Sequence, residues 1–326
     1  MMLALRPAKP SHGAPNAPVK AAPVDLARDS STRAGLQAIG RACLKQIIGN
    51  EPAVIEGDPE GVHQMRVGLR RFRAAMSLFA ALLPDPQSAA VNRELKWLAG
   101  ELAPVREFDV LIQRVVTPAK KRASRWKEIA GFVRALLEQR EQALAKAQRA
   151  VTSARSRRLM VELAAWLDSG LWTHSHDDLV RDRGGAPIGV FAAEQLTRRW
   201  RKVCKKRRSF GDMDAETRHR LRIQTKKLRY AAEFLAGLFS GERASKRKKK
   251  LLPALERLQD NLGDLNDIAV DERIVAKIGI RRRRSDTKRA FATGLLTGRE
   301  DARLDAAMAA ADGAYTELIK AKPFWR

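Results

Sequence analysis

The stretch GVHQMRVGLRRFRAAMSLF, residues 61–79, decides the fold that this sequence predicts. At about 100° per residue, its apolar and basic residues fall on different sides of a helix. The apolar side, which can be buried against neighbouring helices, carries Met65, Leu69, Phe72, Met76 and Phe79. The basic side carries His63, Arg66, Arg70 and Arg73. At about 1.5 Å of rise per residue these four side chains form a row roughly 15 Å long, which suits a rod of phosphates.

The same pattern returns as HRLRIQTKKLRYAAEFL, residues 219–235. A second pair of similar segments follows, LAPVREFDV from residue 102 and LGDLNDIAV from residue 262. Two pairs in the same order predict an internal repeat of about half the chain. The matched basic positions are His63 and His219, Arg66 and Arg222, Arg70 and Lys226, Arg71 and Lys227, and Arg73 and Arg229.

The composition favours a helical protein with a polyanionic partner. Hydrophobic residues make up 44% of the 326 residues, enough for a core, and aromatic residues only 6%. The formal net charge is +26, which indicates nucleic acid, an acidic membrane surface or polyphosphate as the partner. No apolar run reaches the roughly 18 residues of a membrane helix, so no membrane partner is expected. Two cysteines in a chain of this length fit a reducing cytoplasm.

The doubled motif carries a family resemblance. HQMRVGLRRFR with the later REFDV, and HRLRIQTKKLR with LQDNLGDLND, resemble the two halves of the CHAD family, the histidine-containing α-helical domain. The chain departs from the family's motif at Glu107 and Asn266. The resemblance implies an all-α fold of two four-helix bundles, related by a pseudo-twofold axis around a basic central groove or pore. It also implies binding of inorganic polyphosphate.

Breaks in the helical pattern divide the chain into four parts. Residues 1–30, rich in proline and alanine, are predicted to be a disordered tail. Residues 31–170 are the first bundle repeat, 171–187 a linker, and 188–326 the second repeat. A helix break is expected at Pro104, and the basic runs 245–250 and 281–284 are expected in loops. The predicted helices cover residues 30–48, 61–79, 89–102, 109–116, 128–149, 157–167, 188–208, 219–235 and 302–320.

Polyphosphate has no bases to read, so a binder needs several cations at fixed spacing on rigid elements. Arginine offers a planar fork to phosphate oxygens, and lysine a compact point charge. The plain alternative for such faces is a solvated helix surface. The two histidines have two open roles, contact with phosphate or anchoring of the helix start through a carbonyl or carboxylate. The candidate polyphosphate ligands are His63, Arg66, Arg70, Arg71, Arg73, Arg201, Lys202, Lys205, His219, Arg222, Lys226, Lys227 and Arg229.

The expected function is therefore non-enzymatic polyphosphate binding in the cytoplasm, in association with polyphosphate granules. No phosphate-binding glycine loop or hydrolase motif is present, and we expect no cofactor and no metal site. Nucleic acid is expected to bind only weakly or without specificity. The alternatives are a basic helical nucleic-acid-binding protein, an accessory subunit of a phosphate-metabolising enzyme, and an enzyme acting on polyphosphate. The sequence does not define an oligomeric state.

Overall fold

The protein is built from helices throughout the part of the chain that the structure describes. The computed structural model describes the backbone of residues 17–120, 123–204, 210–280 and 287–326, and the side chains there except those within 115–129 and 275–302 and at 269 and 272. These residues form no strand, only an isolated bridge between Ser31 and Pro187. The predicted all-α class is confirmed.

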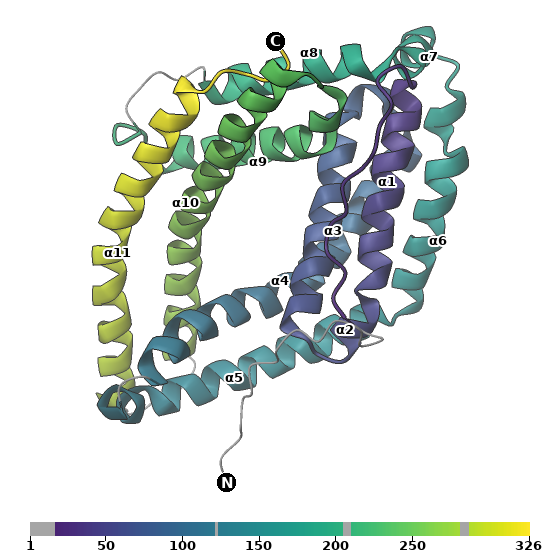
Figure 1. The fold of residues 1–326 in the computed structure, drawn as a ribbon. Coiled ribbons are helices and arrows are strands. Elements are labelled where there is room, and N and C mark those ends of the chain that lie inside the picture. The colour runs from purple at the N-terminus through teal and green to yellow at the C-terminus, as the bar shows by residue number, and fades with distance from the viewer. Residues whose placement is uncertain (1–16, 121–122, 205–209, 281–286) are drawn as a thin grey trace.

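The helices follow one another with short connections (Figure 1). The longer ones belong to two matched sets of four, and the remainder are short or connect the sets. In chain order they are α1 (Thr32–Gly49), α2 (Glu51–Ile55), α3 (Pro59–Leu78), η1 (Ala80–Leu82), α4 (Pro86–Lys120), α5 (Ala123–Val151), α6 (Ala154–Ser169), η2 (Leu171–His174), α7 (Asp178–Gly185), α8 (Ile188–Cys204), α9 (Ala215–Leu235), η3 (Ala236–Leu238), α10 (Glu242–Ile280) and α11 (Thr287–Lys320).

The order of helix contacts in the first half recurs in the second. Helix α1 packs on α3, α3 on α4, and α4 on α5, just as α8 packs on α9, α9 on α10, and α10 on α11. The halves meet where α3 contacts α9. Figure 1 shows α3, α4, α9 and α10 as the inner sides of a four-sided frame, with their partners outside. This contact order agrees with the predicted repeat, whereas the pseudo-twofold relation remains a prediction.

Helix α3 starts and packs as its sequence requires. The Asp58 side chain caps it by accepting a hydrogen bond from the Glu60 amide at 2.9 Å, and Pro59 occupies the first turn. Gly61 and Gly68 allow close packing, because a Cβ atom would lie 2.4 Å from Ala53 and 2.9 Å from the Ile47 side chain. The predicted apolar side is buried as expected at Met65, Leu69, Phe72, Met76 and Phe79.

Two local predictions were wrong. Helix α4 runs unbroken through Pro104, whose ring is exposed, so packing of α4 against α5 outweighs the one lost hydrogen bond. The basic run 245–250 belongs to helix α10, where Lys248 donates to the Phe239 carbonyl at 2.8 Å. The linker 171–187 contains η2 and α7, the latter capped by Asp177. The run 281–284 lies outside the described residues.

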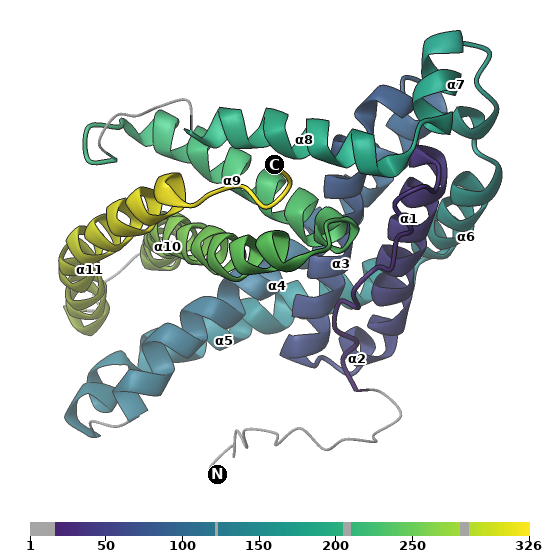
Figure 2. The same cartoon turned by 45° about the horizontal axis from the view of Figure 1, so that its top comes forward.

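The predicted tail is ordered from residue 17 onward, and Figures 1 and 2 show this segment running alongside α1. Asn50 holds it by accepting a hydrogen bond from the Val19 amide at 2.9 Å and donating to the Val19 carbonyl at 2.8 Å. Val24 and Leu26 pack against the core. The prediction of a disordered tail missed this ordered segment, because it was based on the high alanine and proline content, which does not reveal a few specific contacts.

Asn50→Ala should lower the free energy of unfolding by about 2 kcal/mol, because it removes these buried hydrogen bonds. Asn50 is fully buried and also donates to the Gln46 carbonyl at 2.7 Å. Urea denaturation followed by circular dichroism measures the change, with Gln142→Ala at an exposed position of α5 as control. Equal urea midpoints for Asn50→Ala and the unmodified protein would show that the segment adds no stability.

Candidate functional site

Helices α3 and α9 form the walls of a groove made of two adjoining cavities. We call the first the mixed cavity, of about 540 Å³, because residues of both charges from α3, α4, α9 and α10 line it. The second, the basic cavity, has about 580 Å³ and four cations, with no carboxylate among the described residues that line it. Arg70 and Lys226 line both cavities. One residue from each half therefore marks the point where the cavities meet.

The mixed cavity sets a row of cations opposite a row of carboxylates. Helix α10 carries its aspartates at spacings of four, three and four, on one face. Arg114 of α4 binds three of them, at 3.3 Å from Asp264 and 3.0 Å from both Asp267 and Asp271. The cations are Arg66, Arg70, Arg106, Arg222 and Lys226, and the carboxylates are Glu107, Asp260, Asp264, Asp267 and Asp271.

The groove's central cations have no carboxylate partner among the residues that the structure describes. Within the described chain, Arg66, Arg70, Arg222 and Lys226 form no ion pair within 4.0 Å. The buried Nε atoms of Arg70 and Arg222 also have no hydrogen-bond acceptor there. Buried donors are normally satisfied. These two guanidinium groups therefore carry unsatisfied donors next to the cavity that their side chains line.

Burial and mutual repulsion disfavour the charged forms of these groups. Burial, then the neighbouring Arg222 and Arg70, lower the pKa of Lys226 to about 8. Burial and Arg70 lower the pKa of Arg66 to about 10. Burial, Arg106 and the α3 arginines lower the pKa of His63 to about 4, so His63 is neutral near pH 7. An anion in the groove would relieve this repulsion.

The structure brings together seven of the predicted residues and adds one. Arg106 of α4 also lines the mixed cavity. It lies in the REFDV segment, which was used only to recognise the repeat and the family, and the helix break predicted at Pro104 gave no sign that Arg106 would reach a cavity shared with α3 and α9. The seven predicted residues that line the groove are His63, Arg66, Arg70, Arg73, Arg222, Lys226 and Lys227.

The prediction that Arg71 contacts polyphosphate is corrected, because the structure buries its side chain in the core. Its side chain is 2% exposed, and its Nε lies 2.9 Å from Oε1 of Glu233 on α9. Its Nη1 donates to the Gln46 side chain at 3.1 Å, and its guanidinium lies 5.3 Å from the Phe234 ring centre. The matched residue Lys227 is exposed and lines the basic cavity. The two copies therefore use this position differently.

Other predicted residues lie away from the groove. Arg201 and Lys202 line a separate, open cavity of about 1110 Å³ beside Trp200 and Arg326. His219 is exposed and, like Arg229, lines neither groove cavity. Lys205 lies outside the described residues. The copies thus contribute unequally, with four residues from α3 and three from α9.

The described part of the chain also bears on metal sites and on membrane-spanning helices. It has no group of three or more His, Cys, Asp or Glu side chains arranged to hold a metal ion. Every helix described there is too short or too polar to cross a bilayer.

Comparisons with known proteins agree with the fold. No curated protein matches the chain. A CHAD domain from the plant Ricinus communis, solved as a crystal structure, is 30% identical with a TM-score of 0.74, and the match covers 90% of this chain and 96% of that one. PptA from Streptomyces chartreusis is 19% identical with a TM-score of 0.63, over 88% and 100% of the two chains. The family model described as the CHAD domain matches residues 38–276, and the chain therefore belongs to the CHAD domain family.

Proposed function

We propose that the groove binds inorganic polyphosphate and that the protein acts by binding rather than by catalysis. The observation that carries the proposal is the junction of the two cavities. There Arg70 and Lys226, from matched helices of the two halves, line one groove and have no carboxylate partner among the described residues. A linear polyanion that follows α3 and α9 would contact cations of both halves.

The residue types fit phosphate oxygens. Arg66, Arg70 and Arg222 supply planar forks that can hold two oxygens, and Lys226 supplies a point charge. The basic cavity, whose described lining has no carboxylate, attracts an anion, whereas the five carboxylates of the mixed cavity balance its five cations. A phosphate chain that spans both cavities therefore gains most in the basic cavity. We also propose that the protein is cytoplasmic and associates with polyphosphate granules, where this ligand would be concentrated.

Long-chain polyphosphate should bind at least about ten-fold more tightly than duplex DNA of equal total charge at physiological salt, because a single phosphate chain can lie along a narrow groove whereas a rigid duplex presents its charges on a wider cylinder. Isothermal titration calorimetry of both polymers in one buffer measures this ratio. Repeating it at two salt concentrations should show a steep loss of affinity, since bound phosphates release counterions. Equal or reversed affinities would favour the nucleic-acid-binding alternative, and a flat salt response would exclude a contact with many phosphates.

Affinity for polyphosphate should decline as the pH rises above 8. Lys226 is charged below its pKa of about 8 and neutral above it. A bound polyanion favours the charged form of Lys226, so the protein takes up a proton when it binds above pH 8. The affinity should therefore fall by as much as about ten-fold per pH unit.

Calorimetry between pH 7 and 9.5 tests the effect of pH. Lys226→Arg serves as control, because arginine stays charged in this range, and its affinity should change little. A similar decline in Lys226→Arg and the unmodified protein would place the titrating group elsewhere.

A further inference from the structure

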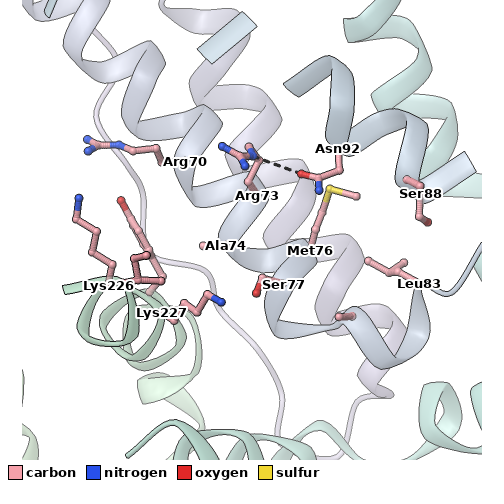
Figure 3. Close-up of a pocket in the computed structure, with 14 residues that line it drawn as sticks. Arg70, Arg73, Ala74, Met76, Ser77, Leu83, Ser88, Asn92, Lys226 and Lys227 are labelled. Atoms are coloured by element: carbon pink, nitrogen blue, oxygen red, sulfur yellow. Dashed lines mark hydrogen bonds between the residues drawn. The ribbon is translucent and has the colours of Figure 1, made fainter. Parts of the chain in front are cut away.

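The basic cavity has two unlike ends. Figure 3 shows Arg70, Lys226 and Lys227 gathered at one end, and Met76 and Leu83 toward the other. Apolar atoms also come from Ala74, Ala80, Ile223 and Tyr230. A cavity of about 580 Å³ falls in the range that small-molecule sites occupy. About half of the residues that line the cavity therefore present apolar atoms, which a site for phosphate alone does not need.

Inorganic polyphosphate does not account for the apolar end. A bare phosphate chain has no apolar surface, so it would leave this wall in contact with water. Ile223, one turn before Lys226 on α9, is 36% exposed and is among the few large apolar side chains left open, so apolar surface also lies beside the cations. A ligand that covered it would gain from removing apolar surface from water.

One amide near the apolar end remains available for hydrogen bonding. The Oδ1 atom of Asn92 accepts a hydrogen bond from Nε of Arg73 at 3.3 Å, as Figure 3 shows. No described residue accepts a hydrogen bond from the Asn92 amide nitrogen. Ser88 is already engaged, since its hydroxyl donates to Asp85 at 2.6 Å and accepts from Trp166 at 3.1 Å. Asn92 can therefore meet a polar ring edge, as can the Ser77 hydroxyl on α3.

We propose that the basic cavity also binds a nucleoside triphosphate. The phosphates lie against Arg70, Arg73, Lys226 and Lys227, and the base covers the apolar wall with its edge toward Asn92. The cavity holds one flat ring but not two acyl chains, which argues against a phospholipid. This inference rests on the proposed function, because it uses the same cations, and it predicts that polyphosphate and nucleotide compete.

The test compares ATP with inorganic triphosphate, which has the same number of phosphates and no base. By calorimetry without divalent cations, ATP should bind about ten-fold more tightly, which corresponds to the gain from covering a small apolar area. Ile223→Asn should lower the affinity for ATP to that for triphosphate and leave long-chain polyphosphate unchanged. The matched control is Val190→Asn, at a 59% exposed apolar position on α8, which should change neither ligand.

The outcomes separate this inference from the proposed function. Equal affinities for ATP and triphosphate, or an equal effect of Ile223→Asn on both, would overturn the nucleotide site. Failure of long-chain polyphosphate to bind while ATP binds would overturn the proposed function and leave the nucleotide site standing. Displacement of bound ATP by polyphosphate is expected as well, and its absence would show that ATP occupies another place. Circular dichroism of each variant confirms that it is folded.

Discussion

Replacing Arg70 and Lys226 together by glutamate should abolish polyphosphate binding while the protein stays folded. Both side chains line both cavities and lack carboxylate partners in the described chain. A hydrogen bond to a charged group contributes about 1.5–3 kcal/mol, so losing two lowers affinity by more than about 100-fold. Charge reversal adds repulsion between protein and ligand.

Calorimetry with long-chain polyphosphate measures the loss, and circular dichroism checks helicity. The matched control is Arg198→Glu with Arg201→Glu, which makes the same change in net charge in the outer cavity beside α8. This control should bind within a few-fold of the unmodified protein, apart from a general decrease in attraction at low salt. If the groove variant bound normally and the α8 variant did not, the site would lie in the outer cavity.

Glu233→Met should lower the free energy of unfolding by about 3 kcal/mol. Arg71 is buried, and its closest anionic partner is Glu233, at 2.9 Å. Removing the carboxylate leaves a buried, uncompensated charge, which costs about 3–5 kcal/mol in other proteins. The lower end is expected here, because Glu233 is 33% exposed and Gln46 still accepts a hydrogen bond from Arg71.

The reverse change should cost much less. Arg71→Met leaves Glu233 near the surface, where water can hydrate it, and the methionine fills apolar space beside Phe234. The double variant Arg71→Met with Glu233→Met should recover most of the stability that Glu233→Met loses. Urea denaturation measures all three variants, with Glu256→Met at an exposed position of α10 as control. If both single variants lost stability equally and the double variant lost the sum, the pair would not be coupled.

The helical period predicted the walls of the groove and most of the α3 and α9 residues that face it, but it misplaced Arg71 and missed the contribution of α4 and α10. The apolar and basic sides of residues 61–79 were separable because they lie far apart around the helix. Arg71 lies at the border between them, and its direction depends on Glu233, a partner from the other half that local pattern does not reveal. The carboxylate row of α10 and Arg106 came to the groove through the arrangement of four helices, which no single helix pattern contains.

Local rules also failed where neighbouring helices outweigh them. Proline predicted a break at position 104, but α4 lies along α5 over a second small core that includes Leu111, Phe132 and Leu136. Packing of that length compensates for one missing hydrogen bond. The reading of 245–250 as a loop failed similarly, since Leu251, Leu255 and Leu258 continue a buried apolar side of the same helix.

Arg71 and Lys227 occupy matched positions but have different surroundings, and this difference is possible because the two copies are joined in one polypeptide. A symmetric dimer of half-length chains would have to place the same residue in the same surroundings twice. If that residue formed a buried ion pair between the copies, neither copy could use it to bind the ligand. A covalently joined pair has no such constraint. One copy can assign the position to internal support while the other assigns it to the ligand, and mutations can then adjust rigidity and affinity separately.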